Sequence, residues 1–122
     1  MIEPSEFLTV ARKLSAPGTG EAEHRTAISR AYYAAYHEAA QKYAIRKNLP
    51  FSDSLFENHQ KFIHELRSQK TSSVARTIGN QLQSLKKDRV LADYKLKASV
   101  TASSALKSCT ASQAIIEGSQ NI

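Results

Sequence analysis

Apolar residues recur every three or four positions along nearly the whole chain, which is the spacing of one face of an α-helix. No stretch alternates for long as a half-buried strand would. We therefore predict an all-α fold, an up-down helical bundle of four main helices plus a shorter one, forming one domain over residues 1–122. The expected helices cover about residues 4–15, 21–47, 54–69, 72–94 and 100–118.

Capping and breaking residues set these limits. Residues 16–20 contain Pro and two Gly, and Asn48-Leu49-Pro50 should stop the long helix. Ser72 or Ser73 can cap the fourth helix. Thr101 or Ser99 can cap the fifth, with Gly118 as the residue just after its end.

Each expected helix has an apolar stripe that should face the core. On helix 54–69 this stripe includes His59, which we interpret as a hydrogen-bonded core histidine, whereas His24 and His64 are expected to be exposed. Cys109 stands among small residues and should be buried. The remaining stripes comprise Phe7, Leu8, Ala11 and Leu14; Ile28, Tyr32, Ala35, Ala39 and Tyr43; Leu55, Phe56, Phe62, Ile63 and Leu66; and Val74, Ile78, Leu82 and Leu85.

Composition excludes several classes of protein. A single cysteine cannot form an intrachain disulfide or a cysteine-based zinc site, and it fits a cytoplasmic setting. No apolar run approaches the roughly 20 residues of a membrane span, and the N-terminus lacks a signal peptide pattern. Neither a glycine-rich phosphate-binding motif nor a metal-binding histidine spacing occurs, so we expect no cofactor and no metal.

The net charge of +6 is concentrated in the middle of the chain. Residues 61–97 hold nine Lys and Arg against three Asp and Glu, and the charges cancel on both sides of this stretch. Such a concentration favours a polyanionic partner through Coulomb attraction and counterion release. A solvated helix face with spare lysines explains the charge equally well.

Helix 21–47 carries the most suggestive set of side chains. Positions seven apart nearly eclipse on a helix, so Arg30 and His37 lie two turns apart on one face, which Thr26, Tyr33 and Gln41 share. A guanidinium binds phosphate, an imidazole titrates near neutrality and moves protons, and a phenol stacks on bases. A polar stripe that merely faces water is the alternative interpretation.

The run SRAYYAAYHEAA around this pair resembles the signature helix of HEPN (higher eukaryotes and prokaryotes nucleotide-binding) domains. It is most similar to small prokaryotic members, many of which are encoded beside a minimal nucleotidyltransferase. The segment RVLADY at residues 89–94 resembles a second motif of these proteins, and the order of elements agrees over nearly the whole chain.

The resemblance implies a helical bundle, commonly a homodimer, that handles nucleotides or RNA. Many members are metal-independent endoribonucleases with a toxin or defence role, in which an Arg is followed after four to six residues by His. Arg30 and His37 have six residues between them and are the candidate catalytic pair. Ala31 stands where an Asn or Asp commonly follows the Arg, which keeps a non-catalytic role open.

Three further basic residues are candidate contacts for RNA or a nucleotide, together with Tyr33: Arg89, Lys86 and Lys87. Arg89 falls on the apolar stripe of its helix, with Asp93 one turn beyond as an ion-pair partner. Arg89 could serve as a second phosphate contact near Arg30, or as a structural partner of Asp93.

Three functions follow from these observations. The first is a ribonuclease that uses attack by the RNA 2′-hydroxyl, with His37 moving the proton and Arg30 stabilising charge. The second is a non-catalytic nucleotide-binding or partner module of a nucleotidyltransferase. The third is a structural helical adaptor that binds an acidic protein. A nucleotidyltransferase or an antitoxin is the expected protein partner.

Overall fold

A computed structural model describes residues 2–122; Met1, the first residue of the expected domain, lies outside them. Helices account for all the regular secondary structure in this range, which confirms the all-α prediction. They are α1 (Pro4–Leu14), α2 (Glu21–Lys47), α3 (His59–Arg67), α4 (Ser73–Tyr94) and α5 (Ala102–Ser119), with a short 3-10 helix, η1 (Ser54–Phe56), before α3.

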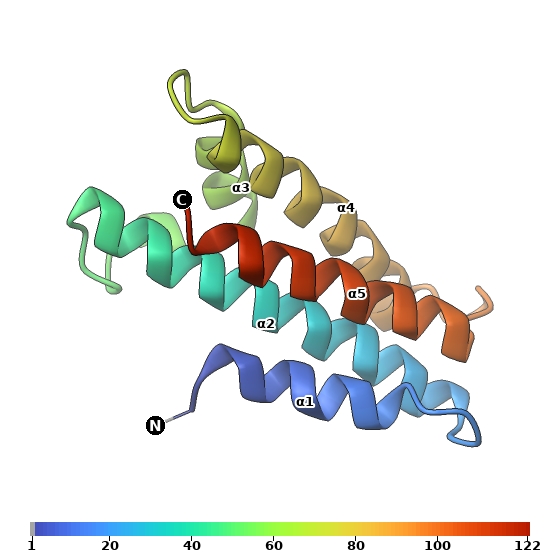
Figure 1. Ribbon diagram of the computed structural model, residues 1–122. Coiled ribbons are helices and arrows are strands. Elements are labelled where there is room, and N and C mark those ends of the chain that lie inside the picture. The colour runs from blue at the N-terminus through green and yellow to red at the C-terminus, as the bar shows by residue number, and fades with distance from the viewer. Residues whose placement is uncertain (1) are drawn as a thin grey trace.

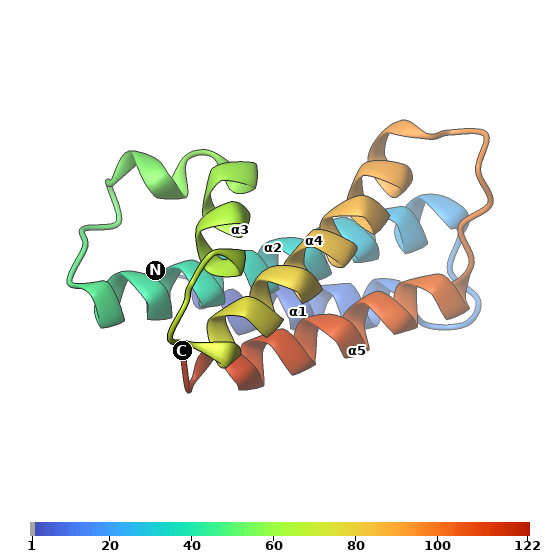
Figure 2. The same cartoon turned by 90° about the horizontal axis from the view of Figure 1, so that it is seen from above.

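The four long helices alternate in direction, as an up-down bundle requires. In Figure 1, α1 and α4 run one way and α2 and α5 run the other way. In Figure 1 the short α3 and α4 lie on the same side of α2, and Figure 2 shows that α4 crosses α2 obliquely with α3 beside it. Helix α2 contacts α1, α4 and α5, so it is the central element of the fold.

Alanines explain why α2 can occupy this position. Five of its alanines have no exposed surface, namely Ala27, Ala31, Ala34, Ala35 and Ala39. Their small side chains allow neighbouring helices to approach closely on two sides. The predicted core face of α2, from Ile28 to Tyr43, is buried as expected.

The prediction of one helix over residues 54–69 is wrong. Asp53 accepts a hydrogen bond from the Leu55 amide at 2.9 Å and caps η1, and Asn58 accepts one from the Lys61 amide at 3.0 Å and caps α3. Short polar side chains that bond to nearby amides compete with a continuous helix. The chain therefore breaks between Phe56 and His59.

Other predicted boundaries can now be compared with the structure. Ser72 and Thr101 are the N-caps of α4 and α5, and Asn48 ends α2 in the left-handed conformation with φ 55°. Gly118 lies inside α5, which continues to Ser119, so its assignment as the residue after the helix is wrong.

Two of the expected exposures are confirmed and one is wrong. Cys109 is buried and His64 is exposed, as predicted. His24 is only 8% exposed. Its ring lies 2.8 Å from the Thr19 hydroxyl, because the loop after α1 folds back over the first turn of α2.

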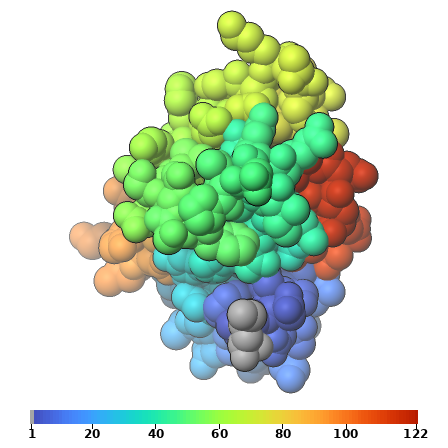
Figure 3. Space-filling view, turned by 90° about the vertical axis from the view of Figure 1, so that its left-hand side faces the viewer, coloured from blue at the N-terminus to red at the C-terminus, as the bar shows by residue number. Residues whose placement is uncertain are grey.

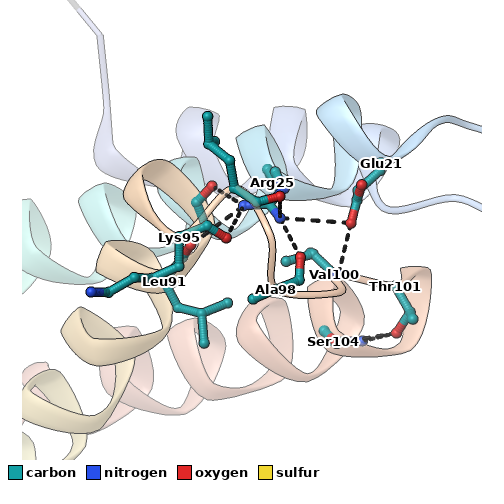
Figure 4. A network of polar contacts seen from close by, with 10 residues as sticks. Glu21, Arg25, Leu91, Lys95, Ala98, Val100, Thr101 and Ser104 are labelled. Carbon is teal, nitrogen blue, oxygen red and sulfur yellow. Dashed lines mark hydrogen bonds and ion pairs between the residues drawn. The ribbon is translucent and has the colours of Figure 1, made fainter.

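The loop between α4 and α5 is fixed to α2 by Arg25 (Figure 4). The Arg25 guanidinium donates hydrogen bonds to backbone carbonyls at the end of α4 and in the loop, among them those of Ala92, Lys95 and Ala98. Glu21 pairs with Arg25 at 3.7 Å and accepts a hydrogen bond from the Val100 amide at 2.9 Å.

Over residues 2–122, every helix is too short or too polar to cross a membrane.

Candidate functional site

The Arg30 and His37 side chains lie against the same two aromatic rings. The guanidinium carbon of Arg30 is 5.6 Å from the centre of the Phe7 ring and 5.0 Å from that of Tyr33. The His37 ring is 5.9 Å and 6.2 Å from the same two centres. The structure thus brings Arg30, Tyr33 and His37 together, as the spacing predicted.

Phe7 is a member of this cluster that sequence reasoning missed. It was expected only as part of the apolar stripe of the first helix, and nothing in the local pattern distinguishes it from Leu8. In the structure Leu8 is buried, whereas Phe7 is half-buried and faces α2. Its ring stabilises the guanidinium by a cation–π interaction and limits how Arg30 can move.

Arg89 enters the cluster from α4. Its guanidinium carbon is 5.3 Å from the centre of the Tyr32 ring and 5.8 Å from that of Tyr33. Nη1 lies 3.5 Å from Asp93, so the predicted Arg–Asp pair is present. The Tyr33 ring thus lies close to two guanidinium groups, those of Arg30 and Arg89.

Arg89 retains donor capacity although it is mostly buried. Its side chain is 14% exposed, and its buried Nε has no hydrogen-bond partner within residues 2–122. A buried N–H without a partner costs free energy, and an acceptor such as a phosphate oxygen could relieve that cost only if the side chain moved to expose Nε.

His59 also belongs to the cluster. Its Nδ1 lies 2.8 Å from the Tyr32 hydroxyl, which confirms the predicted hydrogen bond, but the residue is half-buried and the predicted core position is wrong. Its ring stacks on Tyr36 with centres 3.8 Å apart. Its closeness to the Arg30–His37 face was not predicted, because it depends on how α3 packs on α2.

Both imidazoles are disposed to be neutral. Burial and, to a lesser extent, the charge of Arg30 lower the pKa of His37. Burial, followed by the positive charges of Arg89 and Lys86, lowers the pKa of His59 to about 4. At neutral pH each ring therefore carries a lone pair that can accept a proton.

Lys86 and Lys87 are neighbours, but their amino groups have different surroundings. The Lys86 amino group donates a hydrogen bond to Gln60 at 2.9 Å, and its charge acts on His59. Lys87 is exposed and lines a shallow hollow with Lys86, Val90, Leu91 and Lys95. Lys86 thus lies at the edge of the cluster, whereas Lys87 could contact only a ligand that extends along α4.

Part of the positive charge of residues 61–97 has a structural role. Arg67 donates to the Asn80 side chain at 2.9 Å, and Arg76 donates to the Gln69 carbonyl at 2.7 Å. The exposed cations of this stretch are Lys61, Arg67, Lys70, Lys87, Lys95 and Lys97.

Nowhere in residues 2–122 do three or more His, Cys, Asp or Glu side chains gather as a metal ion would need.

Comparisons with known proteins return no match for this chain, either among family models or among curated proteins and solved structures. The chemistry of the cluster therefore carries the functional argument. It combines two guanidinium groups, two imidazoles disposed to be neutral and several aromatic rings on one side of the bundle, and some of these groups are buried. Such a set can bind a phosphate and an aromatic ring together, and its neutral imidazoles can accept a proton from a bound ligand.

Proposed function

We propose that this protein is a metal-independent endoribonuclease of HEPN type with a toxin or defence role. The observation that carries the proposal is the placement of Arg30 and His37 against the same pair of rings, Phe7 and Tyr33. One side chain supplies a fixed positive charge and the other a proton acceptor. Resemblance to HEPN domains supports the choice of RNA as substrate, and the single cysteine supports a cytoplasmic setting.

The reaction that fits these groups is attack by a ribose 2′-hydroxyl on the adjacent phosphate. Neutral His37 removes the hydroxyl proton as the new O–P bond forms. Arg30 stabilises the negative charge that develops on the phosphate oxygens, and Arg89 is the second guanidinium close enough to the Tyr33 ring to assist. The P–O5′ bond breaks, the leaving 5′-oxygen takes a proton from solvent water, and His37 later releases its own proton to solvent. The products are a 2′,3′-cyclic phosphate and a free 5′-hydroxyl.

The proposal includes a homodimer in which the faces that carry Arg30 and His37 approach each other. His37 is exposed and Arg30 is half-buried, so this face is open in the single chain. Light scattering at micromolar concentration should give twice the mass of the chain. A mass equal to that of one chain would contradict the homodimer but would not contradict the catalytic role of Arg30 and His37.

A second function is favoured by one observation. Ala31, which follows Arg30, has no exposed surface and packs in the core. The polar residue that commonly stands there in HEPN nucleases is therefore missing from the site. A nucleotide-binding module that assists a nucleotidyltransferase or is bound by an antitoxin would need only the binding groups.

One experiment separates these functions. Purified protein is incubated with mixed RNA in excess EDTA, and the product ends are mapped. His37→Ala should abolish cleavage and leave most RNA affinity, because the imidazole acts mainly in the transition state. Arg30→Ala should reduce both cleavage and affinity, because its charge also meets the ground-state phosphate. His64→Ala, an exposed histidine on α3, is the matched control and should cleave normally.

The pH profile gives an independent check on the role of His37. Because its pKa is lowered, the neutral form predominates already below pH 6.5, and the acid limb of the rate should have its midpoint below that value. Activity that survives His37→Ala, or that EDTA abolishes, would overturn the mechanism. If the wild type cleaves no RNA, the nucleotide-binding module becomes the better interpretation.

A further inference from the structure

A pocket of about 320 Å³ has His37 and His59 in its wall. Its lining comes from α2, from α3 and from the segment that joins them, and comprises Tyr36, His37, Ala40, Gln41, Phe51, Phe56 and His59. The joining segment and the end of α2 are the green surface in Figure 3. The volume is at the lower end of the range for small-molecule sites, which suits one aromatic ring system better than a long ligand.

The walls of this pocket are aromatic. Tyr36 is 2% exposed and its hydroxyl donates to the Phe56 carbonyl at 2.8 Å, which fixes its ring in place. The His59 ring stacks on it with centres 3.8 Å apart, so these two rings form one rigid surface. Gln41 adds an amide that can both donate to and accept from the edge of a ligand.

Phe51 is exposed in a way that needs a reason. Its side chain is 56% exposed on the loop between α2 and η1, and its ring centre is 6.3 Å from that of Phe56. A large aromatic at the rim of a pocket loses most of its contact with water once a flat ligand stacks on it. The exposure of Phe51 is thus explained if the pocket has an aromatic occupant.

Charge around the pocket has the pattern that a nucleotide needs. The lining holds no Lys, Arg, Asp or Glu among the described residues. Cations lie next to it instead: the charge of Arg30 reaches His37, and those of Arg89 and Lys86 reach His59. A neutral aromatic ring therefore fits inside while an attached phosphate lies among the guanidinium groups.

We propose that this pocket binds one unpaired nucleobase of the RNA, so that the substrate is single-stranded or looped RNA. This inference rests on the proposed ribonuclease function and names the group that lies beside the phosphate to be cleaved. A base held in a duplex cannot enter a pocket of this kind, whereas an unstacked base can be held against aromatic rings and an amide.

The test compares two small probes, AMP and ribose 5-phosphate, which share the sugar and phosphate and differ in the base. Binding is followed at pH 7.5 by the ring signals of His37 and His59. AMP should bind at least about tenfold more tightly than ribose 5-phosphate, since stacking of one base contributes on the order of a tenfold or larger factor. Phe51→Ala should weaken AMP roughly 5- to 150-fold and leave ribose 5-phosphate unchanged.

Two further variants control for loss of the apolar side chain itself. Phe51→Tyr keeps an aromatic ring and should bind AMP as the wild type does. Leu106→Ala removes a large apolar side chain, 47% exposed on α5, and should change neither affinity. Both Phe51 and Leu106 are at the surface, so circular dichroism should show a folded bundle in every variant.

The outcomes distinguish this inference from the proposed function. Equal affinities for AMP and ribose 5-phosphate, undetectable AMP binding, or an AMP affinity within twofold of wild type in Phe51→Ala would each overturn the nucleobase pocket, even if RNA is cleaved. Conversely, if AMP binds as expected and no RNA is cleaved, the pocket stands and the ribonuclease function fails. With active enzyme, a fully paired duplex should be cleaved at least tenfold more slowly than the same strand unpaired.

Discussion

Replacing Arg25 by alanine removes the group that holds the α4–α5 loop on α2. The guanidinium bridges elements distant in sequence, because residue 25 bonds to carbonyls of residues 91–98. Its side chain is only 11% exposed, so water cannot fully take its place in the folded protein. We expect Arg25→Ala to destabilise the bundle without affecting the Arg30–His37 face directly.

The magnitude follows from the hydrogen bonds. The two Nη atoms carry four N–H groups, and the most favourable carbonyl partners are those of Ala92 at 2.8 Å, Lys95 at 3.2 Å and Ala98. A hydrogen bond to a charged group contributes about 1.5–3 kcal/mol when well buried, and the loop lies near the surface, so about 1 kcal/mol each is reasonable. Arg25→Ala should therefore lower the free energy of unfolding by about 3 kcal/mol, a large part of a typical domain's stability.

The assay is urea unfolding followed by circular dichroism at 222 nm, with the free energy of unfolding extrapolated to water. Arg25→Lys keeps the charge but loses the planar fork, so it should lose about half as much. Arg46→Ala is the matched control: it removes an exposed arginine from the last turn of α2 and should cost about 0.5 kcal/mol. A loss below about 0.5 kcal/mol for Arg25→Ala would show that the loop is held by other contacts.

Three more predictions concern packing, pH and salt. Gly79→Ala should destabilise the fold, because an added Cβ would lie 3.0 Å from a backbone nitrogen of α3. Gly118→Ala should stabilise the fold by about 0.5–1 kcal/mol, because the atom nearest to its added Cβ is 3.6 Å away, and urea unfolding compares the two variants. The pKa of His59 is lowered to about 4 in the folded state, so as pH falls the unfolded chain takes up the proton first. The free energy of unfolding should therefore fall by about 1–2 kcal/mol between pH 6.5 and pH 4, after allowance for partial exposure of the ring. In unfolding curves taken at each pH, His59→Gln should flatten this dependence. The double variant Lys86→Ala, Lys87→Ala should weaken RNA binding. The slope of log affinity against log salt concentration should fall by the amount expected for up to two lost phosphate contacts. An unchanged slope in a binding titration would show that these lysines only face solvent.

The sequence alone determined the helical class, the long helix over residues 21–47 and the face that carries Arg30 and His37. These features depend on spacing within one helix, and a period of 3.6 residues places side chains on a common face whatever the rest of the chain does. The break between η1 and α3 was missed because the apolar spacing continues across it, although Asp53 and Asn58 are both capping residues.

Only the tertiary structure decided which other residues complete the cluster. Phe7 and His59 look like ordinary core positions in their own helices, and the packing of α1 and α3 on α2 brings them to the Arg30–His37 face. The same packing lowers the pKa of His59, first because it buries the ring and then because it brings the positive charges of Arg89 and Lys86 on α4 close to it. Contacts between helices depend on how whole surfaces fit together, and that information is spread over the entire chain, so a local pattern cannot reveal it.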